Sequence, residues 1–363
     1  MAKTVGVLVL VACGLLWAFN GSEADTALAG KKSVVIEAVP QPVPPEGRPV
    51  ADVRPLPDKT EGAREQLDAA GPASDSGPTG AEGRAARVRA LLSQASSLEA
   101  AGNPAAAAAV LQEGMEASST PAEAARVGFF LAGLAGSPAE SRQLLTGALR
   151  QGVVRGGEYE RAHELLEQLN RSTASSLAGL TDFGDYVVQP NDSLWKLCNK
   201  TFPREFGVSP EVGLVQMVNG LSGTGLRVGQ RLMVPLGTVT VEVDRRQNGL
   251  VAYLGDVALV AYRVGLGKEG RTPSGSFVVE VKLTEPTWFY GGRQIPYGDP
   301  ENILGTRWLG FENHPGATGY GIHGTPNPES VGDNQSMGCV RMRNAEVEEL
   351  FGLLARGTTV NIP

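Results

Sequence analysis

The sequence predicts a multidomain protein whose C-terminal third is all-β, preceded by a small α+β module and an α-helical region. From Val239 onward, short apolar runs alternate with Gly, Asp and Asn, which is typical of strands joined by turns. Between Tyr186 and Pro235, two helical stretches lie between two strand-like stretches. From Glu82 to Leu177, apolar residues recur at helical spacing. A chain of 363 residues is too long for one ordinary core, so several domains are expected.

The N-terminus predicts export. Lys3 precedes an apolar run from Val5 to Phe19, which has the length of a signal peptide and is short for a membrane span. Residues 1–24 are therefore expected to be a signal peptide or a membrane anchor. Cys13 ends a stretch that also resembles a lipoprotein processing box, so lipidation stays open as an alternative. Residues 25–80 are rich in Pro, Gly, Ala, Ser and charge, which favours a disordered linker.

Charge and cysteine content exclude two other classes of protein. The formal net charge is -7, and the charged residues form no basic stripe, so no nucleic-acid partner is expected. Three cysteines, Cys13, Cys198 and Cys339, cannot form a disulfide framework. Cys198 lies in an apolar helical pattern and is expected to be buried, whereas Gly, Ser and Arg flank Cys339.

Residues 81–178 are predicted to be helical and loosely repeat-like. Breaks at Gly102-Asn103-Pro104, Ser118-Ser119-Thr120-Pro121 and Gly136-Ser137-Pro138 divide them into helical hairpins that restart with proline. The region resembles tetratricopeptide-type repeats only loosely, because no strict period is present. We expect a spacer or a module that docks a protein partner.

Residues 184–236 carry a second recognisable pattern. The stretch that opens with Tyr186 ends in Asn-Asp-Ser-Leu, so that Asp192 or Ser193 can cap the first helix, and Leu-Arg-Val-Gly-Gln-Arg-Leu-Met-Val-Pro closes the pattern. The stretch resembles a lysin-motif (LysM) domain, a βααβ module that binds N-acetylglucosamine-containing glycans. The resemblance implies glycan contacts by Asn191, Asp192, Ser193, Asn219, Gly220 and Leu221. A degenerate module without affinity for glycans is the alternative.

The C-terminal domain contains a candidate cysteine nucleophile. Cys339 lies near His314 and His323 in the sequence. A thiol with a pKa of about 8.5 needs a neighbouring base to form the thiolate, and His323 is the candidate. Gly338 lets the backbone bend, so that the N–H groups of Gly338 and Cys339 can face an oxyanion. One Cys and two His without metal-ligand spacing do not predict a zinc site, and no metal or organic cofactor is expected.

Ordered motifs run through the whole of residues 239–363. They are Arg263-Val264-Gly265, Thr272 to Phe277, Lys282, Pro286-Thr287-Trp288, Gly298 to Trp308, Gly321-Ile322-His323-Gly324-Thr325 and Ser336 to Met342. Together they resemble the YkuD-type L,D-transpeptidase family, which implies a β-sandwich-like catalytic domain. The resemblance makes Cys339 the nucleophile, His323 the base and the Gly324 carbonyl the group that orients the imidazole.

The resemblance also assigns supporting roles. Ser336, Gly338 and Arg341 complete the nucleophile loop, with Arg341 placed to order it or to meet a substrate carboxylate. Tyr320, Trp308 and Met337 are the expected substrate contacts. Many family members have a basic residue where Met337 stands, and this difference is expected to alter substrate contacts or the pKa of the thiol. His314 is expected to lie at the surface or at the edge of the substrate.

The implied activity is the formation of 3→3 cross-links between peptidoglycan stem peptides through a cysteine thioester, outside the cytoplasm in the periplasm or cell wall. Its partners would be stem peptides and glycan strands, with the LysM module directing the enzyme to glycan. Membrane contact is expected only through the N-terminal segment. Two alternatives stay open: a hydrolase (carboxypeptidase) of the same fold, and a wall-binding scaffold with impaired catalysis.

Overall fold

The computed structural model describes residues 80–314 and 317–363. The predicted signal peptide or anchor, the candidate lipidation site Cys13 and the predicted linker up to residue 79 lie outside these ranges. Across the described part of the chain, no helix has both the length and the apolar character that crossing a bilayer requires.

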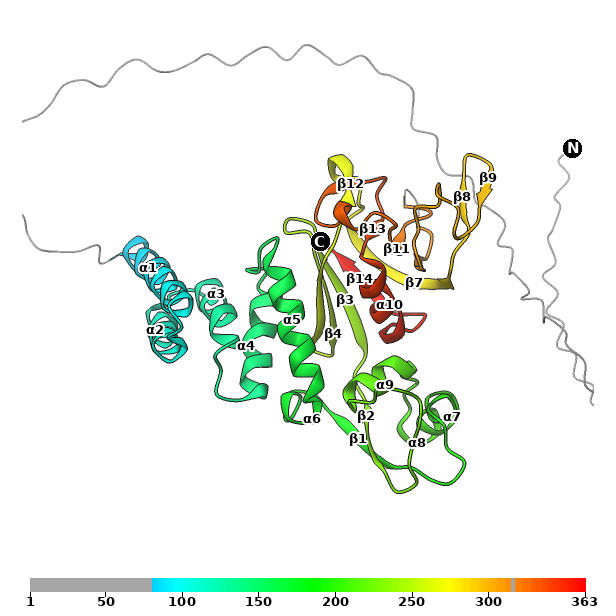
Figure 1. Ribbon diagram of the computed structural model, residues 1–363, viewed down its shortest axis with the longest axis horizontal. Coiled ribbons are helices and arrows are strands. Elements are labelled where there is room, and N and C mark those ends of the chain that lie inside the picture. The colour runs from blue at the N-terminus through cyan, green and yellow to red at the C-terminus, as the bar shows by residue number, and fades with distance from the viewer. Residues whose placement is uncertain (1–79, 315–316) are drawn as a thin grey trace, which may run out of the picture. The chain divides into compact units, whose positions relative to one another are not determined.

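The N-terminal region is helical, as predicted (Figure 1). Its helices are α1 (Ala81–Ala100), α2 (Pro104–Ala117), α3 (Pro121–Ala132), α4 (Pro138–Arg150), α5 (Glu158–Arg171) and α6 (Thr173–Ser176). Helices α2, α3 and α4 each begin with proline, whose fixed φ suits the first helical position. The residue before each proline accepts a backbone hydrogen bond from the first turn with its side chain.

The next module has the predicted βααβ order. Strand β1 (Phe183–Val187) pairs antiparallel with β2 (Arg231–Pro235). Between them lie α7 (Leu194–Lys196), the π-helical turn η1 (Leu197–Thr201), α8 (Phe202–Phe206) and α9 (Val212–Val218). Phe202 is fully buried beside Leu197 and Cys198, so the segment between α7 and α9 contributes to the core. The expected burial of Cys198 is confirmed, and this burial raises the pKa of its thiol to about 12.

The C-terminal domain is built on one eight-stranded sheet, which confirms the all-β prediction. The strand order is β13 (Val340–Arg341), β11 (Gly321–His323), β10 (Arg307–Phe311), β7 (Gly275–Thr284), β14 (Thr359–Ile362), β3 (Val239–Asp244), β4 (Gly249–Leu254) and β5 (Val257–Arg263). Strand β7 pairs with β14 through its first half and with β10 through its second half. The long β7 therefore joins two staggered parts of the sheet, which lets the sheet curl (Figure 1).

Short elements complete this domain. They are β6 (Leu266–Gly267), the 3-10 turns η2 (Lys268–Gly270) and η3 (Pro328–Ser330), β8 (Trp288–Tyr290), β9 (Arg293–Ile295), β12 (Asn334–Ser336) and α10 (Asn344–Leu353). Strand β6 pairs with β12, and β8 pairs with β9 in a hairpin. The buried amide of Asn302 donates to the carbonyls of Pro286 and Ile295 at 3.0 and 2.9 Å, which fixes the base of that hairpin.

Helix α9 belongs to two cores at once. Its Val215 lies in the core of the βααβ module, whereas Leu214 and Val218 lie in the core of the sheet with Leu350 of α10. At Gly213 an added Cβ would come within 2.5 Å of a backbone oxygen of α10, so only glycine permits this close approach. The βααβ module is therefore packed against the C-terminal domain through shared apolar residues.

Helices α4 and α5 also pack on the sheet. Tyr159 and Leu166 of α5 share a buried cluster with Leu145 of α4 and with Tyr253 and Ala258 of β4 and β5. A free-standing spacer would not bury these side chains against a neighbouring domain. The helical region therefore covers part of the sheet.

Candidate functional site

Neighbouring strands hold the predicted nucleophile and base. Strand β11 runs parallel to β13, with His323 opposite Arg341. Cys339 directly precedes β13, and its Sγ lies 3.8 Å from the carbonyl oxygen of Gly319. His323 and Cys339 are thus held by one hydrogen-bonded strand pair.

The imidazole of His323 is held in one tautomer. Its side chain is buried, and Nδ1 lies 2.5 Å from the carbonyl oxygen of Gly324, the contact predicted for this pair. Because a carbonyl only accepts, Nδ1 carries the proton and Nε2 is left to accept one. Burial, helped by the charge of Arg341, lowers the pKa of His323 to about 4, although the Gly324 and Leu304 backbone groups oppose this shift.

The Cys339 thiol is half-buried and also neutral at rest. Burial raises the pKa of the thiol to about 11, although the Gly321 backbone and the charge of Arg341 favour the thiolate. With the base titrating near 4 and the thiol near 11, both groups are uncharged at neutral pH. Proton transfer from thiol to imidazole therefore has to accompany substrate binding or attack.

The nucleophile loop is fixed by the buried hydroxyl of Ser336. This hydroxyl donates to the Cys339 carbonyl oxygen at 2.7 Å and accepts from the Gly338 N–H at 3.0 Å. The prediction that the Gly338 N–H faces an oxyanion is wrong, because Ser336 already uses that donor. The Cys339 N–H stays a prediction as an oxyanion donor. Gly338 contributes its conformation instead, since its φ of +139° is one that side-chain-bearing residues avoid.

Arg341 is positioned by its backbone and has an unused side-chain donor. Its N–H and carbonyl exchange hydrogen bonds with Gly265 at 2.8 and 2.9 Å. Its Nε is buried without a hydrogen-bond partner. Both predicted roles, ordering the loop and meeting a substrate carboxylate, are compatible with this placement.

The three predicted substrate contacts lie in three different places: opposite the base, against Gly338 and within the nucleophile loop. Trp308 lies opposite His323 on β10, with ring centroids 5.9 Å apart. Tyr320 is half-buried, and its ring edge fills the space where Gly338 lacks a side chain. Met337 is 49% exposed, so its thioether is accessible to a ligand. His314 is half-buried near the Phe277 ring at 5.8 Å, which supports no catalytic role for it.

Sequence reasoning missed Asn344, which organises the loop after the base. Its Oδ1 accepts from the backbone N–H groups of Thr306 and Thr325 at 3.2 and 3.1 Å. A Cβ added to Gly324 would lie only 2.2 Å from the same oxygen, so a side chain there would clash with Asn344. No local pattern marks this role in the sequence, because the N–H groups that Asn344 binds lie 38 and 19 positions away from it.

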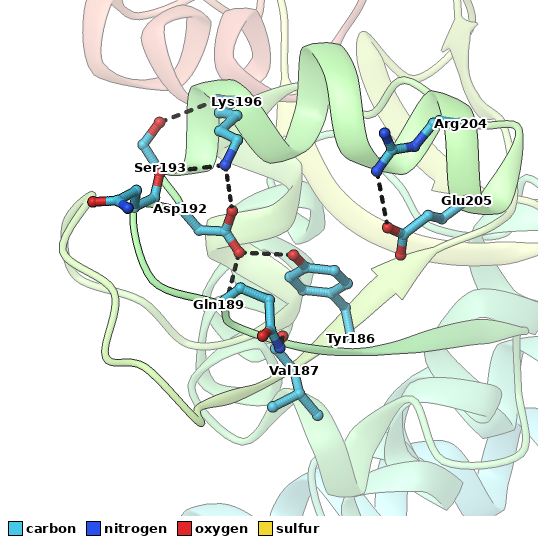
Figure 2. Close-up of polar contacts among 9 residues, drawn as sticks. Tyr186, Val187, Gln189, Asp192, Ser193, Lys196, Arg204 and Glu205 are labelled. Carbon is cyan, nitrogen blue, oxygen red and sulfur yellow. Dashed lines mark hydrogen bonds and ion pairs between the residues drawn. The ribbon is translucent and has the colours of Figure 1, made fainter.

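In the βααβ module, the predicted glycan-contact side chains mostly hold the fold together (Figure 2). The Asp192 carboxylate is 2% exposed and accepts from the Tyr186 hydroxyl, the Gln189 N–H and Lys196 Nζ at 2.7, 2.8 and 3.0 Å. Burial opposes its ionisation, but these hydrogen bonds outweigh burial and lower the pKa of Asp192. Ser193, one of the two predicted caps, accepts from the Lys196 N–H at 3.2 Å.

The second predicted glycan segment shows the same pattern. Asn219 donates to the carbonyls of Val215 and Met233 at 2.8 and 2.9 Å and accepts from the Met233 N–H at 2.7 Å. Leu221 packs on the core, whereas Asn191 and Gly220 have positive φ values of 66° and 60° in turns. Any glycan contact at Asp192 and Asn219 is therefore left to the backbone. Trp195 lies nearby and is 61% exposed. The sequence analysis did not name it as a glycan contact.

Comparison with known proteins identifies both C-terminal modules. The family model of the YkuD-type L,D-transpeptidase catalytic domain matches residues 238–362, and that of the LysM domain matches residues 186–235. YqjB of Bacillus subtilis strain 168, named as an L,D-transpeptidase, is 43% identical over 129 residues, which cover 35% of this chain and 72% of that protein. YkuD of Bacillus licheniformis, named in the same way, is 30% identical over 184 residues, which cover 49% of this chain and 97% of that protein.

Solved structures of the family are similar at lower identity. The catalytic domain of the E. faecium L,D-transpeptidase is 23% identical, with a TM-score of 0.27 over 35% of this chain and 98% of that one. The chain spans 65% of the L,D-transpeptidase 3 of Mycobacterium tuberculosis, with 18% identity and a TM-score of 0.29. The sequence matches show that the chain belongs to the L,D-transpeptidase family of transferases.

The buried imidazole predicts a specific pH dependence of stability. His323 has a pKa of about 4 in the folded protein, against about 6.5 when unfolded. The unfolded chain therefore binds a proton between these values that the folded protein rejects, and folding stability falls as pH drops from 6.5 to 4. The loss is expected to be on the order of 3 kcal/mol. Urea unfolding of wild type and His323→Gln at several pH values measures this loss. If the free energy of unfolding changed equally with pH in both proteins, the prediction would be wrong.

Proposed function

We propose that the protein is an exported peptidoglycan L,D-transpeptidase that forms 3→3 cross-links between stem peptides through a Cys339 thioester. The single observation that carries this proposal is that the strand pair β11–β13 holds the oriented imidazole of His323 on one strand and Cys339 directly before the other. Membership of the L,D-transpeptidase family supports the choice of an acyl donor in which an L-centre carbonyl is joined to a D-amino acid.

In the first half-reaction, the Cys339 sulfur attacks the carbonyl between the diamino acid at position three of a stem tetrapeptide and the terminal D-Ala. His323 Nε2 accepts the thiol proton as the S–C bond forms. The C–N bond then breaks, and D-Ala leaves as an amine that takes this proton from His323. General base catalysis of this kind contributes roughly 10²- to 10⁴-fold.

In the second half-reaction, the side-chain amine of another stem attacks the thioester. His323 accepts a proton from that amine, the new amide forms, and the thiolate leaves and is reprotonated. A thioester suits this exchange because it keeps the acyl group reactive toward a neutral amine. The half-buried Arg341 orders the nucleophile loop or meets a substrate carboxylate, and the LysM module keeps glycan strands near the site.

Intact-mass spectrometry with a disaccharide-tetrapeptide tests the proposal. Wild type is expected to gain the mass of the acyl group and to release D-Ala, whereas Cys339→Ala gains nothing. Adding an amine acceptor should discharge the adduct to a cross-linked product. Discharge to water in the presence of the acceptor would instead identify a hydrolase. A folded protein that binds glycan without ever forming the adduct would sink the proposal in favour of a wall-binding scaffold.

A further inference from the structure

The catalytic sheet ends in an edge strand that the helical region covers. Strand β5 is the last strand in the sheet order, so one row of its backbone groups has no strand partner. Side chains of the helical region take these places. Arg142 donates to the Ala258 carbonyl at 2.7 Å, Thr146 accepts from the Ala258 N–H at 3.1 Å, and Asn170 donates to the Leu259 carbonyl at 3.0 Å. Helices α4 and α5 thus act as the missing neighbour of β5.

At the end of β5, helix α5 reaches charged residues that flank the site. Glu160 Oε1 lies 3.4 Å from Arg263 Nη1, at the last residue of β5. The same oxygen lies 3.7 Å from Arg343 Nη2, at the start of α10. Arg343 also pairs with Glu346 at 2.8 Å, whereas Glu160 is the one acidic partner recorded for Arg263 among the described residues. A single carboxylate from the helical region therefore lies between two arginines of the catalytic domain.

Both arginines adjoin the backbone that holds the nucleophile loop. Arg263 opens the segment 263–267, in which Gly265 exchanges hydrogen bonds with Arg341 and Leu266 donates to the Asp333 carbonyl at 3.0 Å. Strand β6 of this segment pairs with β12, which carries Ser336. The Arg263 guanidinium also lies against Gly332, where an added Cβ would come within 2.3 Å of Nε. On the other flank, Arg343 follows β13 by two residues.

We propose that Glu160 is a positioning residue for the active site and that the helical region is a working part of the catalytic unit. Its carboxylate lies close to both Arg263 and Arg343 and so balances two like charges in the segments that adjoin the nucleophile loop. Without that negative charge the two guanidinium groups repel each other across a short distance, and the strands that hold Ser336 and Arg341 separate. Glu160 lies outside the segments matched by the two family models, whereas both arginines lie within the catalytic segment. It rests on the proposed function only for its kinetic readout.

The test is Glu160→Gln in the full chain, which removes the charge and keeps the shape. With the disaccharide-tetrapeptide, kcat is expected to fall by roughly three- to tenfold with KM changed by less than about twofold. The rate of Cys339 alkylation by iodoacetamide, measured by peptide mass spectrometry at several pH values, should depend on pH differently in this variant than in wild type. Glu164→Gln, which removes an exposed charge one turn along α5, should match wild type in both assays.

Two comparison variants separate positioning from stability. Thr146→Val removes a hydrogen bond near the start of the edge strand β5, away from Arg263 at its end. It is expected to lower the urea midpoint without changing kcat per folded molecule. Arg263→Met removes one of the two charges that repel each other, so combining it with Glu160→Gln should lower kcat by less than the two single effects added together. Wild-type kcat and alkylation in Glu160→Gln, or losses that merely follow its stability, would overturn the proposal. If wild type forms no acyl adduct, the alkylation assay still tests Glu160 independently of the proposed function.

Discussion

Replacing His323 with glutamine is expected to lower kcat/KM for the tetrapeptide donor by roughly 10²- to 10⁴-fold. Glutamine can still donate to the Gly324 carbonyl, the bond that the imidazole makes at 2.5 Å, but it cannot accept the thiol proton. The thiol, with a pKa of about 11, is then left without a base at neutral pH. Steady-state release of D-Ala measures the loss.

The pH profile gives this prediction a second readout. In wild type, protonation of the imidazole near pH 4 removes the base, so kcat/KM should fall below about pH 5 and stay level above it. In His323→Gln, the residual activity should instead rise with pH as the thiol ionises toward pH 11. His163→Gln is the control and should behave like wild type. His163 lies on α5 of the helical region and packs on Tyr262 of β5. Activity of His323→Gln within tenfold of wild type would remove His323 from the role of base.

Local chemistry explains why most elements could be predicted from the sequence. Proline after a polar residue marks helix starts at Pro104, Pro121 and Pro138, because the capping bond and the fixed φ act within one turn. Alternating apolar residues identify the strands of the catalytic domain for the same reason. The places where helices pack are a different matter. An amphipathic face says that a helix is covered but not by what, so the packing of α4 and α5 on the sheet was not predictable.

The site shows the same division between local and tertiary information. The motifs around Cys339 and His323 are local, and the structure places His323 on β11 and Cys339 directly before the neighbouring β13. The use of individual donors depends on which groups the fold brings together. For this reason Ser336 takes the Gly338 N–H that the sequence interpretation assigned to an oxyanion. The side chains of Asp192 and Asn219 likewise form hydrogen bonds within the LysM module and do not point to its surface as free polar groups.

The packing of all three modules has a functional consequence. Helix α9 shares the core of the catalytic domain, and the catalytic edge strand is covered by α4 and α5. Asn344, the first residue of α10, also holds the backbone after His323. Parts of the LysM module and of the helical region therefore belong to the cores that support the catalytic sheet. We therefore expect substitutions at these buried contacts to affect the catalytic domain even though they touch no substrate.

Substituting alanine for Gly338 should cause the other large loss of activity. The Gly338 φ of +139° is unfavourable for alanine, and the added Cβ would lie 2.3 Å from Tyr320 Cε1 and 3.0 Å from the Arg271 carbonyl oxygen. The neighbouring backbone has to shift, and it carries Cys339. A misplacement of about 1 Å at the reacting atom can cost roughly 100-fold, so kcat/KM is expected to fall by about that factor or more.

Gly357→Ala is the matched control for this prediction. Gly357 also has a positive φ, +89°, but no atom lies within 4 Å of the added Cβ. Both variants should lose stability through backbone strain, by about 1 to 3 kcal/mol, but only Gly338→Ala should lose activity per folded molecule. Urea unfolding and D-Ala release on the same samples separate the two effects. Equal activity losses would mean that strain in the domain, rather than the position of the Cys339 sulfur, limits the reaction.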